Sequence, residues 1–455
     1  RLKARMDKLR IGDPLDKSID IGAVVDPIQL KSIKKMVAGS AGEIYHAPID
    51  LPKKGCFYPP TLVSGLSVAD PLMQEEIFGP VLVSSTFRTP AEAVEVANNT
   101  RYGLAATVWT ENVNLALDIA PKLAAGVVWV NATNLFDAAA GFGGVRESGF
   151  GREGGWEGLR AYTRDKKDPS THTHAPAKAK VAEADAVDRT AKLYIGGKQA
   201  RPDSGYSKAV ADKKGQIIGH APIANRKDVR NAVEAMNAAK GWSNTTAHLR
   251  AQILYFLGEN LAARREEFAA RLNAMTGLKS GEADTEAAID AFFTWAAWAD
   301  KNDGRTKAVP MRGVALAMQE PVGKIAAFAS SEAPLSNLAN IIGAALSMGN
   351  RITVVAAEEV PLAATDLIQV LETSDVHSGV VNILTGAHVA LAPHIGGHSD
   401  IDSVWSFSQS DLAYTLEAEA AGNLKRTWIA RGQSNASEFL AAATEVKTIW
   451  VPYGE

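Results

Sequence analysis

The sequence closes one α/β unit before it opens another, and this order constrains the fold more than any other feature. Residues 142–166, FGGVRESGFGREGGWEGLRAYTRDK, are typical of a chain leaving an α/β unit, and residues 193–205, LYIGGKQARPDSG, are typical of a chain entering one. Between them, residues 166–190 lack aromatic side chains and any sustained apolar period, which favours a linker. We therefore divide the chain into an N-terminal segment (residues 1–165) and a C-terminal segment (residues 191–455).

Composition indicates a folded protein and excludes some partners. Hydrophobic residues make up 46% of the sequence, enough to bury the cores of two or three ordinary domains. The net charge of -3 gives no reason to bind nucleic acid or an acidic membrane surface. No apolar run reaches the ~18 residues of a membrane span. The single cysteine, Cys56, excludes an internal disulfide and favours a reducing compartment, so the expected location is the cytoplasm.

The N-terminal segment alternates strand and helix patterns as a parallel α/β domain does. Short runs rich in β-branched residues predict strands at 80–87, 103–110 and 126–131, apolar enough to be buried on both faces. Apolar residues at helical spacing predict crossover helices at 90–98 and 113–123.

The C-terminal segment predicts a nucleotide-binding type of sheet. Strand patterns at 323–329, 352–355 and 380–384 are separated by helix patterns at 335–348 and 363–372. This βαβ rhythm indicates a right-handed parallel sheet. An alternating stretch ahead of it, AVPMRGVALAMQE, predicts a hairpin near 308–320.

Several motifs of the N-terminal segment resemble the C-terminal half of an aldehyde dehydrogenase catalytic domain. They are QEEIFGPV (74–81), NNTRYGLAATVWT (98–110), GVVWVN (126–131) and FGGVRESGFGREGGWEGLRAYT (142–163). In the C-terminal segment, LYIGGKQ, QEPVGKI, GNRITVVAAEEVPLAA, GVVNILTG and NLKRTWIARGQ resemble the N-terminal cofactor domain of the same superfamily. The order of the two parts resembles the tandem two-unit branch, the sixteenth family.

The resemblance implies a fold and a domain plan. Residues 1–165 would be half of a catalytic domain with a parallel sheet, followed by the linker at 166–190. Residues 191–435 would be a Rossmann-like cofactor domain with an oligomerisation hairpin near 308–320. Residues 436–455 would end in an oligomerisation strand, and a homodimer is the expected assembly.

The resemblance also implies a reaction and its cofactor-binding residues. A cysteine thiolate adds to a small aldehyde, hydride passes to NAD, with NADP not excluded, and a general base activates water. Glu76 matches the carboxylate that accepts the nicotinamide ribose hydroxyls, and Phe78 matches a ring beside the nicotinamide. Gln29 is placed near the same ribose. Without the resemblance, a Glu-Glu pair before a strand is more often a solvated surface.

Phe136 and Phe142 align with aromatic positions that line the aldehyde tunnel. Each could equally be a core aromatic at a strand end. Cys56 aligns with a turn before a Pro-Thr strand, so it is not the nucleophile. The nucleophile and the base are therefore expected upstream of Arg1, and the chain is expected to hold no catalytic residue of its own. A metal site at His172 and His174 is not expected, since two histidines in a linker lack further ligands.

The C-terminal segment resembles the cofactor domain but departs from its functional residues. Glu358 is kept, whereas the residues that replace the family's functional side chains are Glu332, Val355, Ser408, Ala413 and Ala430. A carboxylate at Glu332 would repel a developing oxyanion. We therefore expect a non-catalytic copy. Its last strand, at 444–455, is expected to pair with the sheet of the N-terminal segment and to act as a built-in partner.

Two functions are compatible with the sequence. In the first, the chain is the C-terminal part of an active NAD(P)-dependent aldehyde dehydrogenase. In the second, the whole protein is a non-catalytic scaffold or interaction protein of the same family. The intact EEIFGP, YGL and FGG motifs of the N-terminal segment favour the first.

Overall fold

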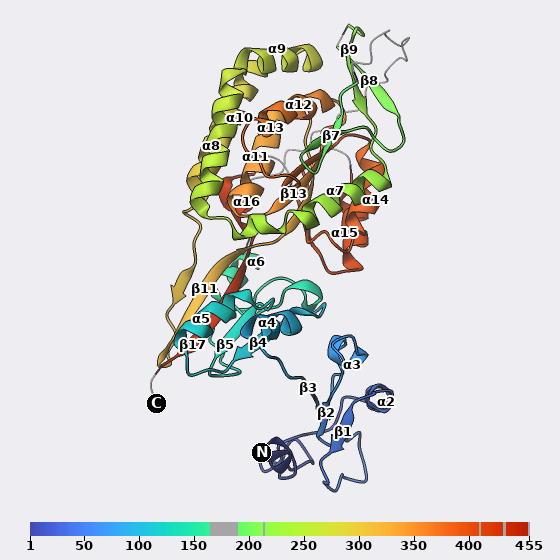
Figure 1. The fold of residues 1–455 in the computed structure, drawn as a ribbon, viewed down its shortest axis with the longest axis vertical. Coiled ribbons are helices and arrows are strands. Elements are labelled where there is room, and N and C mark those ends of the chain that lie inside the picture. Colours follow the sequence, from blue (N-terminus) through green and yellow to red (C-terminus); the bar gives the residue numbers. More distant parts are fainter. Residues whose placement is uncertain (164–189, 213, 409–410, 431–433, 454–455) are drawn as a thin grey trace. The chain divides into compact units, whose positions relative to one another are not determined.

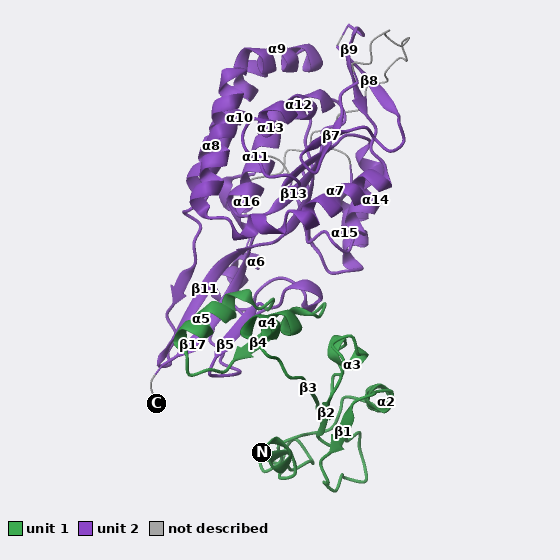
Figure 2. Ribbon diagram, viewed as in Figure 1, with its two compact units in different colours: residues 1–125 green, residues 126–455 purple. Residues whose placement is uncertain are grey.

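The computed structural model describes residues 1–163, 190–212, 214–408, 411–430 and 434–453 (Figure 1). The predicted linker, with His172 and His174, falls almost wholly outside these residues. Contacts divide the chain into unit 1, Arg1–Ala125, and unit 2, Gly126–Glu455 (Figure 2). The division falls within the N-terminal segment, because the strand that begins after Gly126 pairs with elements near the end of the chain.

Unit 1 contains a three-stranded sheet and several short helices. The strands β1 (Glu43–His46), β2 (Thr61–Ser64) and β3 (Val81–Ser84) lie in this order, with β1 and β2 antiparallel and β2 and β3 parallel. The remaining elements are α1 (Leu2–Met6), α2 (Pro27–Ala38), α3 (Pro71–Gln74), α4 (Pro90–Asn98), β4 (Ala105–Val108), α5 (Val113–Ile119) and η1 (Ala120–Lys122).

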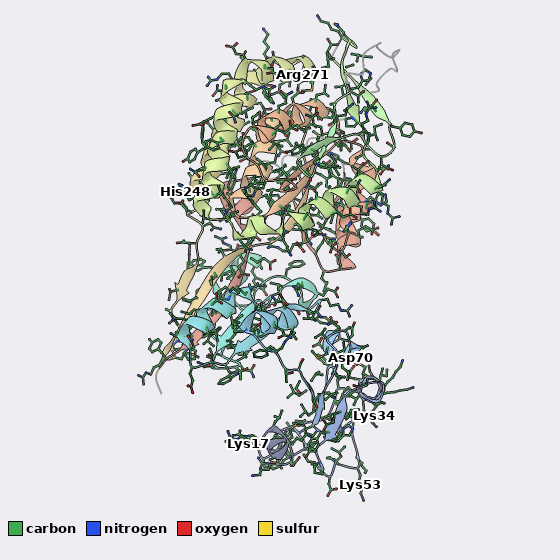
Figure 3. All side chains as sticks on the ribbon, in the orientation of Figure 1. Lys17, Lys34, Lys53, Asp70, His248 and Arg271 are labelled. Atoms are coloured by element: carbon green, nitrogen blue, oxygen red, sulfur yellow. The ribbon has the colours of Figure 1, made fainter. Side chains whose placement is uncertain are left out.

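Proline and a capping side chain start three of these helices. Asp26, Asp70 and Thr89 each accept a hydrogen bond from a backbone N–H of the first turn, and each precedes a proline. Asp70, which is labelled in Figure 3, accepts from Leu72 N at 2.9 Å. The helix α2 then buries Ile33 in a small core that also holds residues of β2 and α3.

The expectation that all three N-terminal strands are buried on both faces is wrong for β3 and β4. Leu82 of β3 is 49% exposed, because β3 is an edge strand of its three-stranded sheet. Ala105 of β4 is exposed as well. Only β5 (Val127–Val130), in unit 2, is buried at every residue.

Unit 2 contains a doubly wound sheet. The strands lie in the order β16-β15-β12-β13-β14-β6-β7, of which the first five are parallel and the last two antiparallel. Their bounds are β6 (Leu193–Ile195), β7 (Lys198–Ala200), β12 (Lys324–Phe328), β13 (Arg351–Val355), β14 (Val381–Leu384), β15 (Ser403–Ser406) and β16 (Arg426–Ile429). The predicted βαβ rhythm is confirmed.

Alternating residues of β12 enter two different cores, so the sheet is covered on both faces. Ile325 packs with one set of helices, and Phe328 packs with the other. The first set is η3 (Lys240–Asn244), α8 (Ala247–Ala263), α9 (Arg265–Thr276), α10 (Gly281–Trp298), α11 (Pro334–Ser347), α12 (Pro361–Asp366), α13 (Ile368–Glu372) and α16 (Ala436–Ala443). The second set is α7 (Arg226–Ala238), α14 (His388–Gly396) and α15 (Ala413–Ala421).

A second sheet of unit 2 combines strands of the N-terminal and the C-terminal segments. The strands β10 (Arg305–Lys307) and β11 (Gly313–Pro321) form a hairpin whose first strand lies just before the predicted range of 308–320. The strand β17 (Thr444–Pro452) pairs antiparallel with β11 along its whole length. On its other side β17 pairs parallel with β5, with Trp450 opposite Trp129. The expected pairing of the terminal strand with a strand of the N-terminal segment is confirmed. The remaining elements are η2 (Arg146–Ser148), α6 (Gly155–Ala161), and the antiparallel pair β8 (Ser207–Ala211) and β9 (Ile217–Pro222).

Candidate functional site

A turn in unit 1 presents two of the predicted cofactor-binding residues. Ile77 is buried and packs with Ile33, while the residues on either side of it, Glu76 and Phe78, are exposed. Phe78 has a positive φ of 52°, and its side chain is 66% exposed. The next residue must be small, because a Cβ on Gly79 would lie 2.4 Å from the Cδ1 of Ile33.

Gln29 holds this turn. Its Nε2 donates to the carbonyl oxygens of Ile77 at 2.9 Å and Phe78 at 3.2 Å. The structure therefore brings Gln29, Glu76 and Phe78 together, although both contacts of the Gln29 amide nitrogen are with the protein backbone. An acceptor-only carboxylate beside an exposed ring, on a turn held by side-chain hydrogen bonds, suits a ligand with hydroxyl groups next to a planar ring.

The two predicted tunnel residues lie together in unit 2. The ring centroids of Phe136 and Phe142 are 4.8 Å apart, and Trp129 lies 6.0 Å from Phe136. Both phenylalanines line a cavity of about 400 Å³, and Trp450 of β17 forms part of the same wall. Sequence reasoning missed Trp129 and Trp450, although both stand in short apolar strands where alternation would direct a large side chain inward.

The carboxyl ends of β12 and β15, where the strand order reverses, mark the edge at which doubly wound sheets bind their ligands. His388, the first residue of α14, donates its backbone N–H to Glu358 Oε1 at 2.7 Å. Its ring lies 2.8 Å from the carbonyl oxygen of Ala356 through Nε2 and 2.7 Å from Ser408 Oγ through Nδ1. Because a carbonyl can only accept, Nε2 carries the proton and Nδ1 accepts from the Ser408 hydroxyl.

His388 was not singled out from the sequence. Its ring also lies 5.2 Å from that of Phe328, and its side chain is buried. Glu358, the retained residue, thus serves the start of a helix, and Ser408 serves the histidine. Of the other altered residues, Val355 is buried in the sheet core and Glu332 is exposed.

The buried histidine predicts a pH dependence of stability. Burial lowers the pKa of His388 below its ordinary value of 6.5, and the nearby carboxylates Glu358 and Glu359 oppose this only in part. The unfolded chain therefore binds the proton more readily, so stability present above pH 6.5 is lost as the pH falls towards the folded-state pKa. We expect the melting temperature to fall more steeply below pH 6.5 in the natural protein than in His388→Gln.

The matched control is His248→Gln, because His248 is exposed on α8 (Figure 3). Its pH profile of melting temperature should coincide with that of the natural protein. A His388→Gln profile that also coincides would contradict the role assigned to the buried ring.

Neither a membrane span nor a metal site is found in the part of the chain that the structure describes. None of the helices it contains combines the length and the apolar character of a membrane span. Within the described ranges, no three side chains of histidine, cysteine, aspartate or glutamate gather as metal ligands would.

Comparison with curated proteins relates this chain to several dehydrogenases. It is 37% identical over 169 residues to a betaine aldehyde dehydrogenase of Cereibacter sphaeroides, over 36% of this chain and 35% of that protein. It is 40% identical over 172 residues to a 2-hydroxymuconic semialdehyde dehydrogenase of a Pseudomonas species, over 36% of this chain and 35% of the relative. The chain thus spans about a third of the length of the curated relatives it matches.

Comparison with solved structures supports the fold. The NAD+ complex of an aldehyde dehydrogenase from Bacillus cereus matches with a TM-score of 0.50 and 23% identity, over 53% of this chain and 50% of that chain. An NAD-dependent aldehyde dehydrogenase from Sinorhizobium meliloti matches with a TM-score of 0.51 and 20% identity, over the same shares. The profile of the Aldehyde dehydrogenase family covers residues 1–167 and 199–444, which is most of the sequence. The chain therefore belongs to the aldehyde dehydrogenase family.

Proposed function

We propose that the chain is the C-terminal part of an NAD(P)-dependent aldehyde dehydrogenase that oxidises a small aldehyde to a carboxylate. The observation that carries this proposal is the turn in unit 1, where Gln29 holds the backbone that presents Glu76 and Phe78. A bound nicotinamide cofactor would accept the hydride of the aldehyde. The carboxylate of Glu76 would accept hydrogen bonds from the ribose hydroxyls, and the ring of Phe78 would limit the position of the nicotinamide.

Phe136 and Phe142 would guide the aldehyde. Their paired rings give one side of the cavity an apolar surface, which favours a substrate with an apolar body. The only thiol of the sequence, Cys56, follows a bend ahead of β2, and its own carbonyl oxygen accepts from Val24 N at 2.7 Å. We assign the nucleophilic cysteine and the general-base glutamate to sequence that precedes Arg1.

The C-terminal segment is, in this proposal, a non-catalytic copy of the family's cofactor domain in a tandem, sixteenth-family protein. The contacts of His388 support it, since Glu358 and Ser408 form hydrogen bonds within the protein. The domain plan proposed with it is 1–165, 191–435 and a partner strand at 436–455, joined by the linker. A cytoplasmic homodimer is the proposed form.

The test is formation of NADH or NADPH from a simple aldehyde by the full-length protein, followed by absorbance. Production of the reduced cofactor that requires the aldehyde supports the proposal. A full-length protein that binds no nicotinamide cofactor and reduces none would instead support the non-catalytic scaffold.

The cofactor contact is tested by Glu76→Gln in the full-length enzyme. The amide keeps the size of the side chain but loses the charge, and a hydrogen bond to a charged group contributes about 1.5–3 kcal/mol. We therefore expect kcat/KM for the cofactor to fall by about tenfold to a hundredfold. Glu95→Gln, on the exposed face of α4, is the control and should match the natural enzyme. Equal kinetics for both variants would remove Glu76 from the site.

A further inference from the structure

A second, larger cavity lies within unit 2 and takes no part in the proposed dehydrogenase site. Its volume is about 620 Å³, within the range of small-molecule sites. One side is formed by Phe150, Trp156 and Arg160, on α6 or just before it. The facing side contains Trp298, at the end of α10, and Arg305 of β10. The cavity therefore combines residues of the N-terminal and the C-terminal segments.

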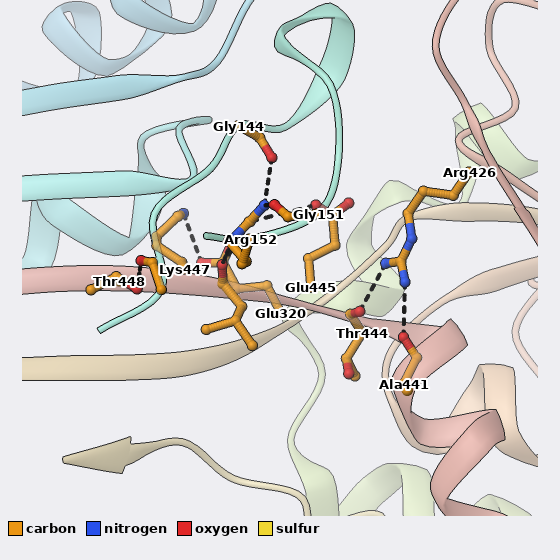
Figure 4. Close-up of polar contacts among 12 residues, drawn as sticks. Gly144, Gly151, Arg152, Glu320, Arg426, Ala441, Thr444, Glu445, Lys447 and Thr448 are labelled. Atoms are coloured by element: carbon orange, nitrogen blue, oxygen red, sulfur yellow. Dashed lines mark hydrogen bonds and ion pairs between the residues drawn. The ribbon is translucent and has the colours of Figure 1, made fainter. Parts of the chain in front are cut away.

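Two arginines are fixed where β17 enters this cavity. The Nε and Nη2 of Arg152 donate to the carbonyl oxygen of Val446 at 2.8 and 2.7 Å. The Nη1 of Arg426 donates to the carbonyl oxygen of Thr444 at 2.9 Å. Figure 4 shows Glu445 between these two guanidinium groups, with its carboxylate 4.0 Å from Arg152. One carboxylate thus faces two immobilised cations.

The whole lining has an excess of positive charge. Its cationic side chains are Arg152, Arg160, Lys301, Arg305 and Arg426, and its carboxylates are Glu157, Asp303 and Glu445. Glu157 pairs with Lys307 at 2.9 Å and Lys301 pairs with Asp300, which leaves two carboxylates against four cations in the lining. An anion from solution would balance this charge, because cations held near low-dielectric walls are stabilised by a counter-charge.

Two cations of the lining, Arg160 and Arg305, are available to a ligand. Arg160 and Arg305 are exposed, and neither guanidinium forms an ion pair or side-chain hydrogen bond with the described residues. Aromatic surface adjoins them: Trp156 is 62% exposed and Phe150 is 56% exposed, while Trp298 is half-buried. Exposed indole and phenyl rings beside guanidinium groups suit a planar ring that carries an anionic group.

We propose that this cavity binds a small organic anion with an aromatic ring, whose carboxylate or phosphate contacts Arg160 and Arg305. The ring lies against Trp156 and Trp298, and the fixed charges of Arg152 and Arg426 raise the affinity for the anion. The proposal does not depend on the dehydrogenase function, because it uses none of the residues assigned to the cofactor or the aldehyde.

The experiment titrates the full-length protein with four probes, 1-naphthoate, 1-naphthyl phosphate, neutral 1-naphthol and aliphatic octanoate. Calorimetry gives the dissociation constant, and tryptophan fluorescence reports on the rings. We expect saturable binding of the two aromatic anions tighter than about 1 mM, with the neutral and aliphatic probes at least about tenfold weaker. The anion that binds more tightly shows whether the cavity prefers a phosphate or a carboxylate.

Variants assign the binding to this cavity. Arg160→Gln and Arg305→Gln should each weaken the binding of the aromatic anion by about tenfold, and Trp156→Phe should remove most of the fluorescence change on binding. Arg230→Gln, on the exposed side of α7, should bind as the natural protein does. The proposal is overturned if neither aromatic anion binds, if naphthol binds as tightly as they do, or if both cavity arginine variants retain full affinity.

Discussion

Deleting residues 444–455 is expected to destabilise the protein more than any single substitution. The strand β17 that these residues form lies between β11 and β5 and pairs with both. Its removal exposes two strand edges at once, which invites aggregation as well as unfolding. It also removes Ile449 and Trp450, which are almost completely buried. We expect the truncated chain to be insoluble or to unfold at a much lower temperature, as measured by calorimetry.

A point variant distinguishes the effect of lost side-chain packing from the effect of shortening the chain. Trp450→Ala leaves the backbone of β17 intact but empties a site next to Trp129 and Ala315, and truncating a buried tryptophan costs about 3–5 kcal/mol. Tyr453→Ala is the matched control, because Tyr453 is 58% exposed beyond the strand and its loss should change stability by less than about 0.5 kcal/mol. Full stability of both the truncated protein and Trp450→Ala would show that β17 is not part of the core.

The strands could be predicted from the sequence because their signals are local. Val446, Ile449 and Trp450 indicate the strand β17, and an unbroken apolar run indicates β5. Their mutual pairing followed from the resemblance to the family rather than from the pattern. Nothing in either strand specifies a parallel register, which depends on the pleat and on the strand that lies on the other side.

The polar contacts that hold β17 could not be predicted. Arg152 and Val446 are 294 residues apart in the sequence, and an arginine in a glycine-rich stretch shows no preference for one distant carbonyl over another. Ser408 illustrates the same limit. The sequence indicates that a glycine of the family is replaced, but only the structure shows that the new hydroxyl lies against a buried histidine. A replaced family residue therefore indicates that a function is lost, but it does not indicate which contact the new side chain makes.

The backbone of the turn that presents Glu76 and Phe78 was predictable for the opposite reason. Glu76, Phe78 and Gly79 are neighbours in sequence, so one short motif fixes their spacing, and the positive φ of Phe78 is a property of the turn itself. The contact from Gln29 joins residues 48 positions apart, and the sequence placed this side chain near the ribose without indicating that it bonds the turn.

Replacing Arg152 by methionine is the second change expected to have a large effect. Methionine occupies a similar length but donates no hydrogen bond, so the carbonyl oxygens of Val446, Gly144 and Gly151 each lose a donor. Glu445 also loses its ion-pair partner. Removing one partner of a buried charge pair costs about 3–5 kcal/mol. The free energy of unfolding in urea should fall by about this amount, whereas Arg230→Gln should leave it unchanged.

The decrease in the free energy of unfolding caused by Arg152→Met should also depend on pH. Burial already raises the pKa of Glu445 above its ordinary value of 4.5, and Arg152 is one of the cations that lower it. Without Arg152 this pKa rises further, so the folded state holds a proton that the unfolded chain releases, and stability is lost as the pH rises from 4.5 through the folded-state pKa. Arg152→Met should therefore lose less stability at about pH 5 than at about pH 8. Adding Glu445→Gln should restore part of the loss at the higher pH. A deficit of equal size at both pH values, which Glu445→Gln does not change, would mean that the lost carbonyl hydrogen bonds, and not the charge of Glu445, account for the whole effect.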